Sequence, residues 1–256
     1  MTLRPAWPQE KKGEGMTVLL EAVTVVDIAS ECAGAESVGL LAARRPLTWL
    51  RQTAAKLLFE WRYGVHTSEF VHLEELGLAH QDRAYYSPAN WMTLRRTLPR
   101  REVAPDDVFL DLGSGMGRMV LEAAAGYRFR TVIGVELSRH LNEIARANLK
   151  STRVRLRCGD VRLVTSDALD YAIPDEVNTV FMNNPFGGEV FSRVIDNLIE
   201  SVDRRPRRVR LIYFNPVEEA RLLATGRFRL VRTVARGRGK PEVFGSTRVY
   251  LLEPRA

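Results

Sequence analysis

From residue 108 onward, short apolar runs alternate with longer segments whose apolar positions recur every three or four residues. The runs are Val108–Leu112, Thr131–Val135, Val161–Thr165, Val177–Met182 and Val209–Phe214. The segments between them are Met116–Ala125, Ser138–Leu149, Gly188–Val202 and Val217–Ala224. This alternation is typical of a parallel sheet whose faces are covered by helices. Because such crossovers are right-handed, the pattern predicts a doubly wound sheet.

The last two apolar runs are Phe228–Val234 and Thr247–Leu252, separated by a segment rich in Gly, Arg and Pro. That segment leaves no room for a crossover helix, so the two strands are expected to pair antiparallel. The predicted fold class is therefore α/β: a doubly wound, Rossmann-like, mostly parallel seven-stranded sheet with a C-terminal antiparallel hairpin.

A helical region is predicted before the sheet. Apolar positions recur at helical spacing from Leu47 to Tyr63, and shorter helices are predicted from Ser68 to Leu78 and from Pro88 to Leu98. These helices are expected to cover the functional edge of the sheet.

The first residues differ in composition from the rest. Prolines, glycines and lysines with little to bury predict a disordered leader, and Met16 is a second candidate start. The predicted domains are a leader over residues 1–15, an N-terminal helical cap over 16–100 and a sheet domain over 101–256.

Composition narrows the class of protein. The 256 residues are 45% hydrophobic, enough for one sizeable core. The net charge is +7, and nearly all of the basic residues are arginines. This charge is weak evidence for a polyanionic partner.

Cysteines and histidines give no sign of a metal site. Cys32, Cys158 and the four histidines lack ligand or disulfide spacing, so no metal is predicted and a reducing, cytoplasmic location is expected. Glu21 interrupts the apolar stretch from Met16 to Val26, so no membrane span is predicted.

One loop carries the clearest chemistry. Residues 111–117 read Asp-Leu-Gly-Ser-Gly-Met-Gly, directly after the first apolar run. Glycine lacks a Cβ and tolerates positive φ, so such a loop lets the backbone approach a ligand closely. A dinucleotide fingerprint would need a glycine at position 118, which is Arg118 here. Asp111 can accept a hydrogen bond from an amino group but would repel a pyrophosphate.

This loop resembles that of the class I S-adenosylmethionine-dependent methyltransferases. The resemblance implies S-adenosyl-L-methionine as cofactor, S-adenosyl-L-homocysteine as product and a terminal hairpin on the parallel sheet. It also implies that the cofactor contacts Asp111, Gly113, Ser114, Gly115 and Gly117.

Two further strand ends carry acidic residues. Glu136 ends the second strand, where an acid can accept hydrogen bonds from both ribose hydroxyls. Ser166-Asp167-Ala168 ends the third strand, and the resemblance implies that Asp167 accepts from the adenine amine. Two alternatives are that Asp167 caps a helix beginning at Ala168, or that Asp160 makes the adenine contact. The carboxyl ends of parallel strands share one edge, so these residues are expected near the glycine loop.

The fourth strand ends in Phe-Met-Asn-Asn-Pro-Phe, residues 181–186. This resembles the Asn/Asp-Pro-Pro-Tyr/Phe signature of methyltransferases that act on amide or nucleobase nitrogen. Either Asn184 replaces the first proline, or Asn184-Pro185-Phe186 is a shortened version. In both registers an asparagine oxygen can accept a hydrogen bond from a substrate N–H and direct the nitrogen lone pair toward the methyl group.

A second resemblance covers more of the surrounding residues. The non-SET histone-lysine methyltransferases pair a D-L-G-S-G-x-G loop with Asn-Asn-Phe-Ala-Phe-Gly-Pro-Glu-Val on the fourth strand. Residues 183–190 read Asn-Asn-Pro-Phe-Gly-Gly-Glu-Val, with one residue fewer before Gly187. The similarity covers roughly the cofactor half of the chain.

The leading hypothesis is therefore an S-adenosylmethionine-dependent methyltransferase that acts on nitrogen in a small molecule, peptide or protein. Transfer from an activated sulfonium requires positioning, a neutral amine and a dry pocket. Phe186 and Tyr86 can offer aromatic faces to the sulfonium, although Phe186 as core and Tyr86 as a helix staple are alternatives. The predicted reaction residues are Asn183, Asn184, Pro185, Phe186 and Tyr86, and Asn183 is also a predicted cofactor contact.

Two other functions stay open. The asparagine-proline-phenylalanine end and the positive charge are compatible with a methyltransferase that acts on RNA or DNA, which would bind with steep salt dependence. The second open function is a domain that binds the cofactor but does not transfer a methyl group. The arginines of 204–208 are expected in a solvated turn opposite the site, and the basic loop 236–240 is a solubilising loop or a phosphate contact.

Overall fold

The computed structural model describes residues 58–68, 88–234 and 246–255. The chain divides into two units, Met1–Gln52 and Thr53–Ala256, and all the described residues belong to the second. The predicted leader, the first part of the helix predicted over 47–63 and nearly all of the helix predicted over 68–78 lie outside the described residues. The same is true of Tyr86 and of the basic loop 236–240.

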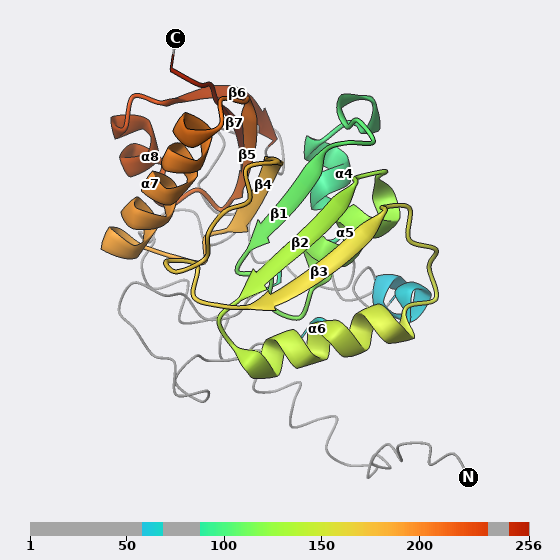
Figure 1. Cartoon of the computed structure of the whole chain (residues 1–256). Helices are drawn as coiled ribbons and strands as arrows, with labels where there is room; N and C mark the ends of the chain where they lie inside the picture. The colour runs from blue at the N-terminus through green and yellow to red at the C-terminus, as the bar shows by residue number, and fades with distance from the viewer. Residues whose placement is uncertain (1–57, 69–87, 235–245, 256) are drawn as a thin grey trace, which may run out of the picture. The chain divides into compact units, whose positions relative to one another are not determined.

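The described residues form one seven-stranded sheet with the order β3-β2-β1-β4-β5-β7-β6 (Figure 1). The strands are β1 Val108–Leu112, β2 Thr131–Glu136, β3 Asp160–Thr165, β4 Val177–Asn183, β5 Val209–Phe214, β6 Phe228–Val234 and β7 Thr247–Leu252. The first five pair in parallel, whereas β7 is antiparallel to both β5 and β6. The predicted fold class and the terminal hairpin are confirmed. The hairpin turns back so that β7, not β6, lies against β5.

The helices between the parallel strands begin and end within a few residues of their predicted limits. The helices are α4 Thr93–Thr97, the 3-10 turn η1 Arg100–Glu102, α5 Arg118–Gly126, α6 Arg139–Ser151, α7 Gly188–Arg204 and α8 Glu219–Ala224. Ser138 caps α6, because its Oγ accepts a hydrogen bond from the Leu141 N–H at 3.2 Å.

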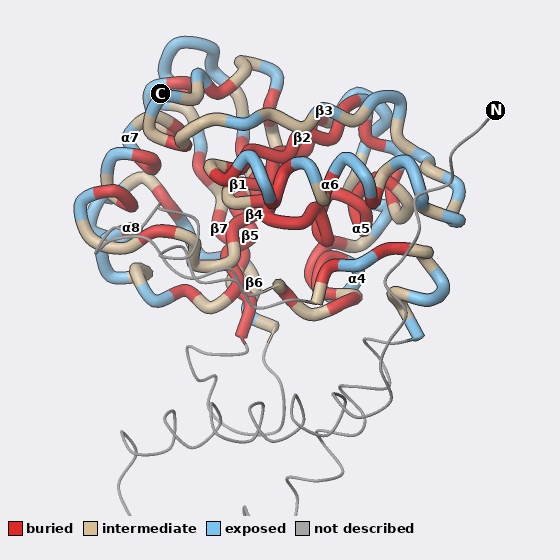
Figure 2. The backbone as a smooth tube through the Cα atoms, turned by 90° about the horizontal axis from the view of Figure 1, so that it is seen from below, coloured by how far each residue is buried: buried red, intermediate tan, exposed pale blue. Residues whose placement is uncertain are grey.

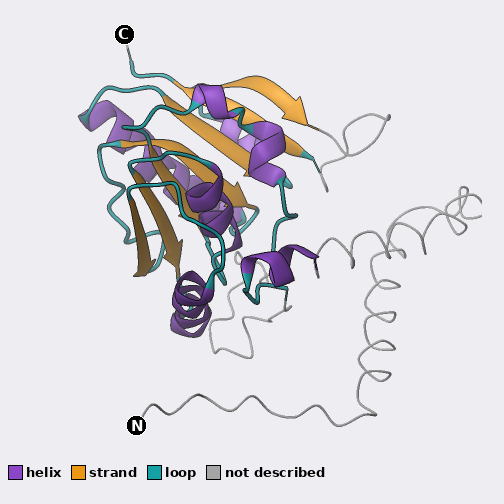
Figure 3. Ribbon diagram, turned by 90° about the vertical axis from the view of Figure 1, so that its right-hand side faces the viewer, coloured by secondary structure: helices purple, strands orange, loops and turns teal. Residues whose placement is uncertain are grey.

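Helices cover both faces of the sheet (Figure 3). Side chains alternate along each strand, so Phe109 packs with α4 and α5, while Leu110 packs on the opposite face with residues of α7 and α8. Strands β1 and β2 are buried at every position (Figure 2). This burial explains why the two strands are apolar apart from Asp111, Thr131 and Glu136. No helix in the described part of the chain is long and apolar enough to cross a membrane.

Helix α4 is shorter than the sequence predicts over residues 88–98. Met92, in the left-handed conformation with φ +68°, precedes the first helical residue. A backbone N–H in the first turn of α4 finds its acceptor on another helix. Glu122 of α5 accepts a hydrogen bond from the Arg95 N–H through Oε1 at 3.2 Å. A long-range carboxyl therefore contributes to fixing the N-terminus of α4.

Glu122→Gln is expected to reduce the loss of stability that accompanies rising pH. Burial raises the pKa of Glu122 from 4.5 to about 7. As pH rises, the unfolded chain releases this proton first, so the free energy of unfolding falls between those two values by about 3 kcal/mol at most. Urea unfolding of both proteins at about pH 5 and about pH 8 measures the change. Equal pH dependence in the two proteins would contradict the assignment.

The helical residues 58–63 pack beside the C-terminal end of α6 (Figure 1). The Arg153 N–H and the Thr152 hydroxyl both donate to the Tyr63 carbonyl, at 2.8 and 3.0 Å. The rings of Phe59 and Tyr63 lie 5.5 and 4.8 Å from Trp91. The helix predicted over 47–63 is thus helical where the structure describes it, and it is anchored by aromatic contacts.

Candidate functional site

The glycine loop follows β1 in a conformation that requires glycine. Gly113, Gly115 and Gly117 have φ of +77°, +52° and +82°. The N–H groups of Gly113 and Ser114 donate to the Val135 carbonyl at 2.9 and 3.0 Å, which ties the loop to the end of β2. A Cβ on Gly113 would lie 2.7 Å from Cβ of Pro185. The loop therefore touches the asparagine-proline motif that follows β4.

Asp111 lies at the end of β1 and is 2% exposed. Burial, and secondly the nearby Glu136, raise its pKa well above the ordinary value. A buried carboxyl of this kind is stabilised as the anion when a positive charge binds beside it. Asp111 is therefore well placed to hold a ligand ammonium.

Glu136 ends β2 and connects the loop to α6. Its Oε2 accepts a hydrogen bond from the Gly115 N–H at 2.8 Å, and its Oε1 accepts one from the Ser138 N–H at 2.9 Å. Burial raises the pKa of Glu136 despite these backbone hydrogen bonds, which lower it. Each carboxylate oxygen can accept a further hydrogen bond, so a contact with a ligand diol stays available.

The segment after β3 forms a tight turn. Asp167 Oδ1 accepts from the Leu169 N–H at 3.1 Å, and the Asp167 carbonyl accepts from the Asp170 N–H at 3.2 Å. The Ser166 N–H donates to the Glu136 carbonyl at 3.0 Å, which places this turn next to β2. The side chain thus makes a hydrogen bond within this turn, but no helix begins at Ala168, so the predicted alternative of a helix cap is wrong; Ala168 is buried in the core. The adenine contact of Asp167 stays a prediction.

Asp160 lies far from this edge. It pairs with Thr131 at the beginning of β2 and forms an ion pair with Arg162 at 2.7 Å. Because the beginnings and ends of parallel strands lie at opposite edges of a sheet, Asp160 is not a candidate for the site. The Arg204–Arg208 segment also precedes a strand, β5, and Arg204 forms an ion pair with Asp175 at 2.5 Å.

The two asparagines at the end of β4, Asn183 and Asn184, are held by residues of β5 and the turn that follows it. The Tyr213 hydroxyl donates to Asn184 Oδ1 at 3.0 Å, and Asn215 Nδ2 donates to Asn183 Oδ1 at 3.1 Å. Asn184 has φ of +44°, which a non-glycine residue rarely adopts and asparagine adopts most readily. The sequence pattern did not reveal Tyr213 or Asn215. An asparagine directly after a strand that ends at the same edge is the signal that could have found Asn215.

The other motif residues differ in environment. Pro185 packs against Gly113 of the glycine loop, and Phe186 is 9% exposed within the main core cluster. Phe186 therefore packs as a core residue, which was the alternative to a cofactor contact. A contact of its ring with a sulfonium stays a prediction, as does any role of Tyr86.

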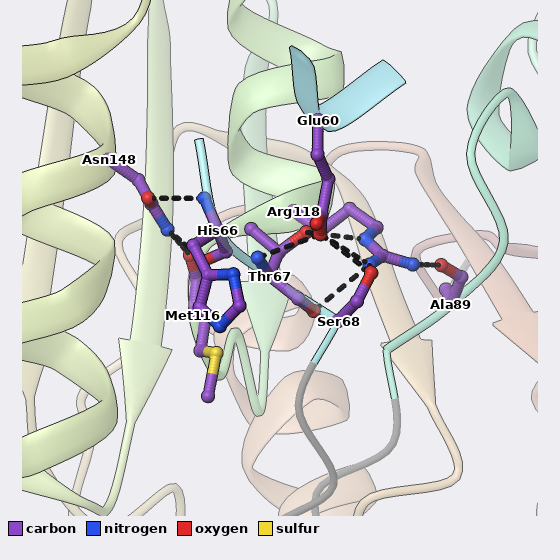
Figure 4. Close-up of polar contacts among 8 residues, drawn as sticks. All are labelled: Glu60, His66, Thr67, Ser68, Ala89, Met116, Arg118 and Asn148. Carbon is purple, nitrogen blue, oxygen red and sulfur yellow. Dashed lines mark hydrogen bonds and ion pairs between the residues drawn. The ribbon is translucent and has the colours of Figure 1, made fainter. Parts of the chain in front are cut away.

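Arg118 directly follows the glycine loop and is 3% exposed, at the centre of a polar cluster (Figure 4). Its guanidinium donates to Thr67 Oγ1 at 2.9 Å, to the Thr67 carbonyl at 3.0 Å, to Ser68 Oγ at 2.7 Å and to the Ala89 carbonyl at 2.8 Å. It also pairs with Glu60 at 3.3 Å. From the sequence, Arg118 is only the residue that stands where a dinucleotide-binding loop would have its third glycine. Its hydrogen-bond partners are distant along the chain, so the sequence pattern does not reveal them.

Asn148 of α6 adds a second connection to the same segment (Figure 4). Its side chain accepts from the His66 N–H at 2.9 Å and donates to the carbonyls of His66 and Met116 at 2.7 and 3.0 Å. Residues 66–68 therefore run beside the glycine loop, held by Asn148 on one side and Arg118 on the other.

Arg118→Lys is expected to lower the free energy of unfolding by about 2 kcal/mol, because a lysine keeps the charge but cannot reach acceptors arranged around a planar fork. Urea unfolding measures the loss. Arg193→Lys, at an exposed position on α7, is the matched control and should change stability by less than about 0.5 kcal/mol. A loss no larger than that of the control would contradict a structural role for the cluster.

The edge of the sheet at which the parallel strands end suits a ligand that carries a positive charge and hydroxyl groups. Two buried carboxyls, Asp111 and Glu136, flank the loop, and Ser114 Oγ is a buried polar atom without a hydrogen-bond partner among the described residues. Unpaired buried hydroxyls are rare, and a bound ligand can satisfy this one. No group of acidic, histidine or cysteine side chains in the described residues could hold a metal ion.

Known proteins share sequence with this part of the chain. A family model described as histone methylation protein DOT1 matches residues 83–218, more than half of the chain. A protein-lysine N-methyltransferase of Saccharolobus islandicus (strain REY15A) is 32% identical over 77 residues, which cover 30% of this chain and 48% of the relative. The match thus spans about half the length of that relative.

Solved structures of other proteins align with part of this chain at low identity. An S-adenosylmethionine-dependent methyltransferase of Methanosarcina mazei aligns with a TM-score of 0.46 and 15% identity, over 59% of this chain and 94% of that one. The magnesium protoporphyrin IX methyltransferase of Synechocystis PCC 6803, solved with bound S-adenosylmethionine, aligns with a TM-score of 0.44 and 20% identity, over 58% and 71%.

Proposed function

The chain belongs to the DOT1 histone methylation family, and from this premise we propose that it transfers a methyl group from S-adenosylmethionine to the side-chain amine of a protein lysine. One observation carries the proposal most directly. The glycine loop and the asparagine-proline motif meet at Gly113 and Pro185, so a cofactor on the loop would present its methyl group next to Asn184. The similarity to the protein-lysine N-methyltransferase of Saccharolobus islandicus supports a protein acceptor.

The cofactor-binding residues follow from the strand ends. Asp111 receives the ammonium of the methionine moiety, Glu136 the ribose hydroxyls and Asp167 the adenine amine. The glycine loop lets the backbone lie close to the ligand, and Ser114 Oγ supplies a further polar contact. When bound, S-adenosylmethionine supplies a methyl group that its positive sulfur already activates for transfer.

The reaction residues orient the acceptor. Asn184 Oδ1 holds one hydrogen bond from Tyr213 and can accept a second, from the N–H of a neutral lysine amine. A hydrogen bond in that position turns the nitrogen lone pair toward the methyl group, and correct orientation can supply most of the acceleration for an in-line displacement. Tyr213 is a positioning residue, because it acts through Asn184.

The test is methyl transfer from isotopically labelled S-adenosylmethionine to a panel of lysine-rich proteins, RNA, DNA and small amines. Mass spectrometry of the labelled product is expected to find methyllysine in a protein. Label found only in nucleic acid or in small amines would overturn the lysine assignment. Cofactor binding without any transfer would leave only a binding domain.

Cofactor affinity is expected to rise with pH. Burial and, secondly, Glu136 raise the pKa of Asp111, so below that raised pKa the free protein carries a neutral Asp111. Binding an ammonium requires the anion, so affinity increases as pH approaches the raised pKa and levels off above it. Calorimetric titration across pH measures this dependence. A flat profile in the wild type would contradict the role of Asp111.

A further inference from the structure

A cavity lies on the flank of α5, with a volume of about 530 Å³. Helix α5 begins at the glycine loop and runs back along the sheet, and the cavity includes Ala125 and Gly126 at its far end. Arg153 and Arg155, which follow α6, complete the same wall. Because the helices run antiparallel to the strands, this places the cavity toward the edge of the sheet opposite the glycine loop.

Arginines surround the mouth of this cavity. Arg62, Arg95, Arg100, Arg153 and Arg155 line it, and all five are exposed. None of them forms an ion pair or a side-chain hydrogen bond in the described part of the chain, although other arginines, such as Arg204, Arg227 and Arg232, pair with acids. Exposed arginines that line a cavity can provide bidentate guanidinium donors, which are suited to phosphate.

The inner wall of the cavity contains polar atoms without partners. Trp91 is 7% exposed and Glu122 is 6% exposed, and both line the cavity. Trp91 Nε1 and Glu122 Oε2 are buried and have no hydrogen-bond partner among the described residues. Buried polar atoms are nearly always paired, so two in one cavity indicate that a ligand supplies the partners. One of these atoms donates and the other accepts.

Aromatic rings form another part of the same wall. Phe59 and Tyr63 line the cavity, and each packs against the ring of Trp91. A planar ligand ring can pack on such a surface. The cavity therefore combines an aromatic surface, a donor and an acceptor inside with a cationic rim outside.

We propose that this cavity binds a nucleoside phosphate at a site separate from the cofactor loop. A nucleobase offers a flat face, an acceptor for Trp91 Nε1 and an amine donor for Glu122 Oε2, while the phosphates reach the arginines. The cavity volume lies in the range of small-molecule sites, roughly 300–1,000 Å³. The proposal does not depend on methyl transfer.

Calorimetric titration of the full chain with ATP, alone and saturated with S-adenosylhomocysteine, tests the proposal. The expected result is micromolar-range ATP binding that S-adenosylhomocysteine does not displace, with adenosine and pyrophosphate each at least about 10-fold weaker. Competition between ATP and S-adenosylhomocysteine would place the nucleotide on the cofactor loop and overturn the proposal. Equal binding of ATP and pyrophosphate would also overturn it, because the inner wall would then have no role.

Substitutions locate the site. Arg95→Ala combined with Arg153→Ala is expected to weaken ATP binding at least about 10-fold, whereas Arg193→Ala on the opposite face leaves it unchanged. Trp91→Phe keeps an aromatic face, although a smaller one, removes the indole N–H and is expected to weaken binding about 5-fold. An equal loss in Arg193→Ala, or tighter binding of a single-stranded oligonucleotide than of ATP, would overturn a nucleotide site in this cavity.

Discussion

Asp111→Asn is expected to weaken S-adenosylmethionine binding about 1,000-fold, or about 4 kcal/mol, because it leaves the ligand ammonium buried without its counter-charge. The substitution keeps the shape of the side chain at the end of β1. It also removes a carboxyl that burial and Glu136 disfavour as the anion, so the fold should be at least as stable as the wild type. Calorimetric titration and thermal unfolding measure the two effects.

Asp160→Asn is the matched control for this prediction. Asp160 is an exposed aspartate at the opposite edge of the sheet, where it pairs with Arg162. Cofactor affinity should be unchanged in this variant. Normal affinity in Asp111→Asn, or an equal loss in both variants, would defeat the placement of the cofactor at the glycine loop.

Asn184→Gly is expected to lower the rate of methyl transfer about 1,000-fold, or about 4 kcal/mol, with little change in cofactor affinity. Glycine adopts the φ of +44° without strain, so the substitution removes the amide alone. Asn184→Ala adds backbone strain at the same position and should also be less stable. Single-turnover rates and calorimetric titration separate the two quantities.

Tyr213→Phe removes the hydroxyl that donates to Asn184 Oδ1 but keeps the ring in the core. It should lower the transfer rate less than Asn184→Gly does, because the amide remains and only its orientation is freed. Loss of cofactor affinity and of rate to the same extent in Asn184→Gly would place Asn184 in the cofactor site.

The sequence predicted the strands closely because they are buried on both faces. Strands β1 and β2 are apolar apart from Asp111, Thr131 and Glu136, and in an α/β chain a short run of this kind indicates a strand that lies between two layers of helices. Helix α4 was harder to delimit. Its start at Thr93 depends on a carboxyl from α5, which no local pattern of caps and prolines reveals.

The candidate site was predictable to the extent that it lies at strand ends. Asp111, Glu136 and the asparagines at the end of β4 come together because parallel strands end at one edge. Asp160 could be set aside only when the register placed it at the beginning of β3. The domain limits and the roles of the site residues stay predictions.

The sequence by itself determined the order of the elements and the parallel core with its terminal hairpin, since both follow from the local periodicity of apolar residues. It also determined which residues meet at the edge where the parallel strands end, since each of them stands at or directly after the end of a strand. The tertiary structure decided the place of β7 beside β5, the hydrogen bond from the Tyr213 hydroxyl to Asn184 and the polar cluster around Arg118. Those contacts join residues 29 to 58 positions apart. The energies of these contacts depend on which surfaces pack together. The spacing of apolar residues along the chain, which predicts helices and strands, does not show which surfaces those are.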